Sequence, residues 1–414
     1  MKPVFIVFIL LFFLKQNFAQ ETITISNDSE IEFLNLNKHL QVFEDETAAM
    51  EIREIITSQK PLFKPFEEVK TEFKPKSALW GKLIINNQTN EQKNYLLISD
   101  RGNIISMNNY VNVYVLDDKI RLAEMINGKL LPLSQKSYEN NAVNAFTINI
   151  PAKKVLSFYI QIRNVNNYAP KFDLSLENQS KFEKNYSEKI AQKNLIQGIF
   201  QGIIWIIFLY AVIMFFIHNN RLFLLYALYL SLIGIDMLNR FDLFGELTNE
   251  KPKLFFYINF LAVNLSLIAY SEFVRKYLNV SKNNPVWNKV FQALVIVMIV
   301  NVINSFLIIY NSFDIPLYRN IGNIVIMIFN FTIGAYLISQ IHDALGSKKI
   351  FIAGGLVFCL GFFIQTFLFY KGIAALNNAN ILQISTLIEI VIFTIALNIN
   401  MKEKRLAESS KLEE

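Results

Sequence analysis

A short apolar run opens the chain at residues 4–14, just after Lys2. With 11 residues it is shorter than the roughly 20 that a helix needs to cross the hydrocarbon of a bilayer. Lys15 would resist burial in lipid, and Ala19 is a small residue suited to cleavage. Residues 1–19 therefore predict a secretory signal peptide, with an uncleaved anchor as the alternative. Under either reading the segment that follows is exported.

Residues 20–180 contain no apolar run of membrane length, and their apolar and polar positions alternate with a period of two. Such alternation is typical of strands that bury one face. It is clear at residues 79–85, 95–99, 111–116, 145–150, 158–163 and 172–177. Polar, turn-rich pieces separate these runs, which predicts an all-β sandwich. One helix is expected at residues 47–58, behind a cap at Thr47.

Seven long apolar segments follow a charged juxtamembrane linker at residues 181–195. They cover residues 196–217, 222–244, 254–273, 290–310, 321–340, 350–370 and 381–400. Each is long enough to cross the hydrocarbon core as a helix. Residues 196–400 thus predict an all-α bundle of seven transmembrane helices, and residues 401–414 a charged helical tail.

The basic residues test the orientation of this bundle, because connections on the cytoplasmic side are enriched in Lys and Arg. If the sandwich lies outside, the inner connections carry Arg221, Arg275, Lys276, Lys282, Lys289, Lys348, Lys349, Lys402, Lys404 and Arg405. The outer connections carry only Lys251, Lys253, Arg319 and Lys371. We therefore expect a multi-pass protein of a bacterial cytoplasmic membrane, with its N-terminal domain outside and its C-terminus in the cytoplasm.

Composition agrees with this division and narrows the function classes. Hydrophobic residues make up 53% of the chain and charged residues only 18%, with a mean hydropathy of +0.30, which argues against a wholly soluble protein. One cysteine, Cys359, and three histidines predict neither a disulfide nor a metal centre, and no cofactor site is expected. The net charge of +6 follows the membrane topology, so we expect no nucleic-acid partner.

Aromatic residues of the exported domain are its candidate ligand contacts. Trp80, Tyr110, Tyr114 and Tyr168 could stack on a sugar or another flat molecule. The alternative is that they belong to the core, since alternation alone does not say which sheet face is open.

Charged residues inside the apolar segments are costly in lipid and are therefore candidates for function. Counting from the predicted segment ends places Asp236 and Glu389 at similar depth, with Arg240 one turn above Asp236. We predict that these three cluster and link the second and seventh helices as an intramembrane relay. The alternative is that Arg240 points outwards, Glu389 is protonated and no contact exists. Interhelical hydrogen bonds are expected from Gln197, Gln201, Asn264, Asn301, Asn304, Asn330 and Gln365.

Enzyme motifs are not found in the sequence. It lacks a Walker loop, a GxGxxG fingerprint and an HExxH helix. It also shows neither the repeated halves nor the paired interrupted helices of transporters. We therefore expect no catalytic activity in this chain, and a membrane enzyme or transporter is the third choice.

Three stretches resemble one family. Residues 78–87, ALWGKLIINN, are similar to a Trp-Leu-Arg-Phe strand followed by asparagines, and residues 111–115, VNVYV, to a Val-x-x-Tyr strand. Residues 198–210 and then 221–229 resemble a first span, a short inner turn and a tyrosine-bearing second span. In this order they resemble the bacterial seven-transmembrane receptors with diverse intracellular signalling modules, over nearly the whole chain. Lys82 stands in place of the usual arginine, as does Gln135-Lys136 after Leu131-Pro132.

The resemblance implies that the exported domain is a jelly roll similar to carbohydrate-binding modules, of the family's type 2 sensor class. It also implies that seven helices pass the state of this domain to a cytoplasmic output. The tail at residues 401–414 is too short to hold a catalytic domain, so we expect the output in a missing module or a separate partner. Our reading is a sensory receptor, with a non-signalling binding or envelope-assembly protein as the alternative. A homodimer is expected only by analogy with the family.

Overall fold

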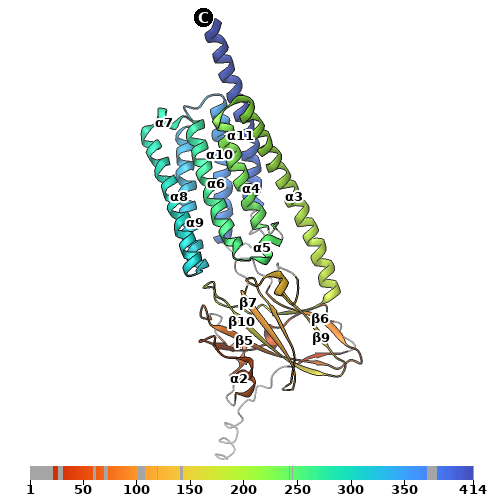
Figure 1. The fold of residues 1–414 in the computed structure, drawn as a ribbon. Helices are drawn as coiled ribbons and strands as arrows, with labels where there is room; N and C mark the ends of the chain where they lie inside the picture. The colour runs from red at the N-terminus through yellow and green to blue at the C-terminus, as the bar shows by residue number, and fades with distance from the viewer. Residues whose placement is uncertain are drawn as a thin grey trace, which may run out of the picture. The chain divides into compact units, whose positions relative to one another are not determined.

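The computed structural model (Figure 1) divides into two compact units, Met1–Tyr186 and Ser187–Glu414. The described residues are 22–26, 31–58, 62–69, 73–100, 108–118, 120–139, 143–241, 243–244, 246–370 and 380–413. The predicted signal peptide, residues 1–19, lies outside them. Each unit is described by itself.

The first unit is built on two β-sheets. The larger has the strand order β4-β3-β5-β10-β7-β8, and β1 pairs in parallel with the end of β5. Its strands are β1 (Ile23–Ile25), β3 (Gln41–Asp45), β4 (Lys64–Pro65), β5 (Ala78–Asn87), β7 (Tyr110–Asp117), β8 (Ile120–Asn127) and β10 (Val155–Arg163). The smaller sheet has the order β2-β11-β6-β9, made by β2 (Phe33–Asn35), β6 (Lys93–Asp100), β9 (Asn144–Ile150) and β11 (Ser175–Asn178).

The core of this unit lies between the sheets. Alternate residues of β5, among them Leu79 and Leu83, pack with Phe146 and Ile148 of β9 in one buried cluster. The two sheets do not close into a barrel. The predicted all-β sandwich is therefore confirmed.

Two local expectations were incomplete. β8 escaped the pattern search because most of its side chains are exposed, as suits the edge of a sheet. The predicted helix at 47–58 begins only at Ile52, as α2 (Ile52–Thr57), behind a capping box of Glu51 and Glu54. Thr47 is not its cap, because the Asp45 carboxylate accepts hydrogen bonds from the Thr47 amide and hydroxyl.

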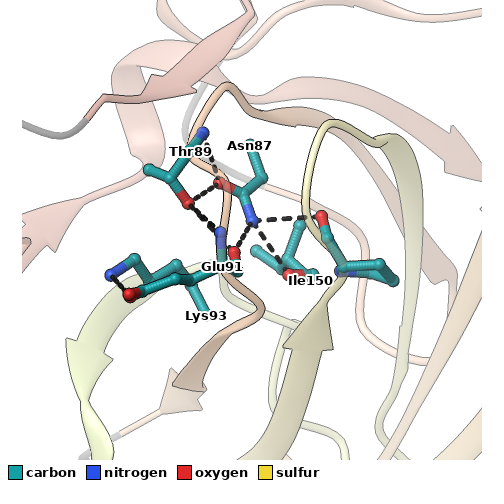
Figure 2. Close-up of polar contacts among 6 residues, drawn as sticks. Asn87, Thr89, Glu91, Lys93 and Ile150 are labelled. Atoms are coloured by element: carbon teal, nitrogen blue, oxygen red, sulfur yellow. Dashed lines mark hydrogen bonds and ion pairs between the residues drawn. The ribbon is translucent and has the colours of Figure 1, made fainter.

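Asn87, at the end of β5, joins the two sheets (Figure 2). Its Nδ2 donates to the carbonyl oxygens of Ile150, Pro151 and Glu91 at 3.0, 3.0 and 2.8 Å. Its Oδ1 accepts from the amide and hydroxyl of Thr89 at 3.0 and 2.7 Å. Because Ile150 ends β9 of the smaller sheet, this one buried amide ties the end of β5 to the end of β9 and closes the following turn.

The described part of the second unit includes seven helices long and apolar enough to cross a membrane. They are α3 (Gln179–His218), α4 (Arg221–Arg240), α6 (Leu254–Tyr277), α8 (Pro285–Asn311), α9 (Ile315–Ser339), α10 (Ser347–Tyr370) and α11 (Asn380–Glu413). Two short helices, α5 (Glu246–Glu250) and α7 (Val280–Asn283), lie in the connections. Figure 1 shows α11 continuing past the ends of the other helices of this unit.

These helices agree with the seven predicted segments and refine their ends. The charged linker at 181–195 is part of α3, because it holds good helix formers without Gly or Pro. The second span stops at Arg240 rather than residue 244. The bundle core is strongly aromatic and includes Tyr226, Tyr270 and Phe393.

Candidate functional sites

Trp80 and Tyr114 lie on the outer face of the larger sheet, beneath α2. Their rings stack with centroids 6.1 Å apart, and Trp80 is 0% exposed. Ile52 and Ile55 of α2 pack against both in a second buried cluster. Of the two alternatives for these aromatics, the structure favours the core, because neither ring offers an open face to a ligand.

Tyr110 and Tyr168 are only half-buried. The guanidinium of Arg163 lies over the Tyr110 ring, 5.5 Å from its centroid. The Tyr168 amide donates to the side chain of Asn166 at 3.3 Å, in the connection after β10. A ligand contact at these two tyrosines stays a prediction.

Glu389 lies on α11 and is 0% exposed. The hydroxyl of Tyr229, on α4, donates to its Oε2 at 2.7 Å. Its Oε1 and the hydroxyl of Tyr270, on α6, have no hydrogen-bond partner within the described ranges. The rings of Tyr229 and Tyr270 are 5.3 Å apart. A buried carboxyl group therefore sits where α4, α6 and α11 meet, and one hydroxyl holds it.

One turn before the end of α4, Asp236 forms a separate site. Arg240 Nε donates to Asp236 Oδ2 at 2.7 Å, and Asn259 of α6 donates to Oδ1 at 3.1 Å. Tyr318 of α9 donates to Asn259 at 2.9 Å. This ion pair is thus fixed to two further helices by neutral side chains.

The structure brings together only part of the predicted cluster of Asp236, Arg240 and Glu389. The Asp236–Arg240 pair forms, but no ion pair or hydrogen bond joins it to Glu389 among the described residues. One reason is that α4 ends four residues before the predicted end of the second span. Its end at Arg240 puts Asp236 close to the helix terminus, whereas Glu389 meets Tyr229, about 10 Å further along the axis. Glu389 still links the second and seventh spans, through Tyr229, and its role in a relay stays a prediction.

The first and last spans touch through polar side chains at three depths. Gln197 and Gln383 exchange amide hydrogen bonds at 2.7 and 3.3 Å and are both buried. Tyr210 donates to Asn398 at 2.6 Å. Arg405 reaches the ring of His218 at 3.1 Å. From Gln197 to His218 these contacts follow α3 for about 30 Å.

Glu403 and Ser347 fasten α11 to the start of α10. Oε1 of Glu403 accepts from the Ser347 amide at 3.1 Å, and Oε2 accepts from the Ser347 hydroxyl at 2.7 Å. Gly346 precedes the helix with φ +54°, and a Cβ there would lie 2.3 Å from Glu403 Oε1. The hydroxyl of Tyr277, at the end of α6, donates to the carbonyls of Ala396 and Ser347 at 2.9 and 3.3 Å. We call these contacts the inner clasp.

Sequence reasoning found some of these residues and missed others. Gln197 was expected to bond another helix and does so, as do Asn264 and Asn301, which meet at 2.9 Å. The inner clasp was missed. Its only local signal is a serine at the start of an apolar segment, and nothing in the sequence pairs that serine with Glu403, which lies on another helix.

No group of three His, Cys, Asp or Glu side chains that could hold a metal ion occurs in the described part of the chain. Two family models match the sequence. One, described as 7TM diverse intracellular signalling, matches residues 193–399, half of the chain. The other, described as 7TMR-DISM extracellular 2, matches residues 37–175. A search of curated proteins found no match.

Seven candidate spans and an extracellular-type domain make this a multi-pass membrane protein with its N-terminal domain outside. The chain belongs to the family of seven-transmembrane receptors with diverse intracellular signalling and carries the type 2 extracellular domain of that family.

Proposed function

We propose that this protein is a sensory receptor of a bacterial cytoplasmic membrane. The sandwich detects a ligand outside, with a carbohydrate-like molecule as one candidate, and the seven helices carry the signal inwards. The C-terminus lies in the cytoplasm, where α11 acts on an output module or a separate signalling partner. Any kinase or cyclase activity belongs to that module or partner.

The observation that carries this proposal is the pairing of α3 with α11. α3 begins at Gln179, directly after β11 of the smaller sheet, and continues without interruption to His218. It is therefore the element through which a change in the sandwich enters the membrane. Its three polar contacts with α11, at Gln383, Asn398 and Arg405, connect that input to the last helix.

α3 can change its position at low cost because few of its side chains are buried in the bundle. Of the most apolar 18-residue stretch of α3, only 22% is buried inside the bundle, whereas 61% of the corresponding stretch of α4 is buried. Lipid replaces lipid along most of such a helix when it shifts, so the movement is resisted by its polar contacts and by a few buried side chains, Phe200, Ile204 and Ala211. α11 is held by the same contacts and by Tyr229 and Ser347. A shift of α3 therefore acts on α11 through a small number of hydrogen bonds.

A fusion tests this proposal without knowledge of the ligand. The catalytic module of a histidine kinase is joined to the end of α11 after Glu413, and autophosphorylation is measured in nanodiscs. Gln383→Leu removes the buried contact with Gln197 but keeps the size of the side chain. Thr332→Val is the matched control, because Thr332 is half-buried on α9 and its hydroxyl donates within its own helix, to the Ile328 carbonyl.

We expect Gln383→Leu to change basal phosphorylation several-fold and Thr332→Val to leave it unchanged. Equal activity in both variants would contradict transmission from α3 to α11. If the unfused chain also co-purified stoichiometrically with other envelope proteins, the assembly role would replace the receptor role.

A further inference from the structure

Lys82 occupies a distinctive place on the outer face of the larger sheet. Strand register places Gln41 of β3, Lys82 of β5 and Tyr159 of β10 side by side on that face. Next to them lies the aromatic cluster of Trp80, Tyr114 and Tyr159 that α2 covers. Lys82 thus lies beside the aromatic cluster that α2 covers, and Lys82 itself is half-buried.

The charge of Lys82 is not compensated. Its ammonium lies over the Tyr159 ring, 5.8 Å from the centroid, and it makes no hydrogen bond or ion pair with any described residue. Burial lowers the pKa of Lys82 below the usual value of 10.5. Leaving a partly desolvated cation unpaired costs free energy, whereas a methionine of similar length would not incur this cost.

The carboxylates that share this face are engaged elsewhere. Asp45 accepts hydrogen bonds from Thr47 and from the Met50 amide. Glu124 forms an ion pair with Arg121 at 3.0 Å. Neither is a partner for Lys82, so the positive charge remains available to a group from outside the chain.

We propose that Lys82, together with Gln41 and Tyr159 on the adjacent strands, forms a binding site for an acidic group, carboxylate or phosphate, of the sensed ligand. The inference rests on the proposed sensory role and specifies the chemistry of its ligand. Lysine supplies a point charge, while the Gln41 amide and the Tyr159 hydroxyl can donate hydrogen bonds to the same anion. The competing explanation is structural: the lysine stem covers the aromatic cluster and the ammonium faces water.

Three probes distinguish the chemistry in titration calorimetry of the full chain in nanodiscs. They are galacturonate, galactose 6-phosphate and the neutral sugar galactose. The variants are Lys82→Met, which removes the charge, Lys82→Arg, which keeps it, and Arg163→Gln. The last is the matched control, because Arg163 is a cation on the same sheet face across the aromatic cluster, and no described acidic residue pairs with it.

We expect one of the two acids to bind at least about tenfold more tightly than galactose, as a charge-assisted hydrogen bond allows. Which acid binds identifies the ligand group as a carboxylate or a phosphate. Lys82→Met should abolish this preference, while Lys82→Arg and Arg163→Gln retain it. Without ligand, Lys82→Met should melt at a higher temperature than wild type, because an unpaired charge has been removed.

The proposal is overturned if neither acid binds better than galactose, or if Arg163→Gln weakens binding as much as Lys82→Met. It is also overturned if Lys82→Met lowers the melting temperature, which would mark a structural lysine. Should Lys82→Met fail to fold, Lys82→Gln takes its place under the same criteria. These binding and melting results are independent of the kinase-fusion assay, so failure of this proposal does not contradict the proposed receptor role.

Discussion

Replacing Asn87 with alanine should weaken the sandwich strongly, because this side chain ties its two sheets together. Asn87 takes part in five hydrogen bonds: to the carbonyls of Glu91, Ile150 and Pro151, and from the amide and hydroxyl of Thr89. The side-chain NH2 group has only two hydrogens for the three carbonyls, and Oδ1 accepts two further hydrogen bonds. We therefore count four independent hydrogen bonds. Asn87 is 0% exposed, and the partners at Ile150 and Thr89 are buried with it.

Each net hydrogen bond contributes about 0.5–1.5 kcal/mol, which puts the loss at about 2–6 kcal/mol. Water can reach the part-buried Glu91 and Pro151 carbonyls after truncation. We therefore expect a loss of about 3 kcal/mol in the free energy of unfolding. In a domain of this size that corresponds to a drop of about 6–12 °C in melting temperature.

Tryptophan fluorescence can follow the melting of the sandwich alone. The chain has three tryptophans, so Trp205→Phe and Trp287→Phe leave Trp80 as the reporter. Asn94→Ala is the matched control, since Asn94 is exposed on β6 and accepts only one bond, from Gln92. If Asn87→Ala melted within about 1 °C of Asn94→Ala, a shift worth well under 1 kcal/mol, the reasoning about the junction would be refuted.

Three other predictions follow from the described contacts. Burial of Asp45 opposes its ionisation, but hydrogen bonds from Thr47 and Met50 lower its pKa below the usual 3.8. The advantage of wild type over Asp45→Asn should therefore be full above about pH 4 and shrink as the pH falls through the folded-state pKa, measured by melting in acid. Gly346→Ala should destabilise the bundle by more than 1 kcal/mol, because its Cβ would collide with Glu403. Gly202→Ala is the control, since a Cβ at Gly202 meets open space and should cost less. Equal effects of the two variants in detergent unfolding would mean that the inner clasp is unimportant. Tyr229→Phe should cost about 1–2 kcal/mol in the same assay and change the basal activity of the kinase fusion; no change in either would remove Glu389 from the transmission path.

Elements with a strong period could be predicted from the sequence. Six alternating runs correspond to β5, β6, β7, β9, β10 and β11, although β11 begins only at Ser175. There, Phe172 and Leu174 are buried outside any strand. Burial without a strand therefore produced part of that alternating pattern. β1 and β2 were not predicted, because three residues are too few to distinguish a strand from such a segment.

Individual contacts were harder to predict than helices. The pair Asp236 and Arg240 follows from a four-residue spacing on one helix, and the structure contains it. The partner of Glu389 depends on how far α11 lies along α4, which no local pattern determines. The predicted end of the second span was four residues too late, about one helical turn, which accounts for part of the two turns between the expected partner, Asp236, and the observed one, Tyr229.

The aromatics of the sandwich show the same limit. Trp80 and Tyr114 alternate as surface residues of a strand would, yet they are buried. Their cover is α2, a helix of only six residues. The register of the strands could have placed these aromatics on one face of the sheet. It could not have shown that α2, a short segment from elsewhere in the chain, covers that face.

The most direct test of transmission from α3 to α11 is a reversible cross-link between them in the kinase fusion. Cys359 is first replaced by alanine, and Gln197→Cys with Gln383→Cys is bridged by a short bis-methanethiosulfonate that a reductant removes. Asn264→Cys with Asn301→Cys provides the control, because this contact joins α6 to α8 and leaves α11 free. The account predicts that bridging α3 to α11 shifts autophosphorylation several-fold and that reduction restores it, with no effect of the control bridge. Unchanged activity with the α3–α11 bridge fully formed would contradict it.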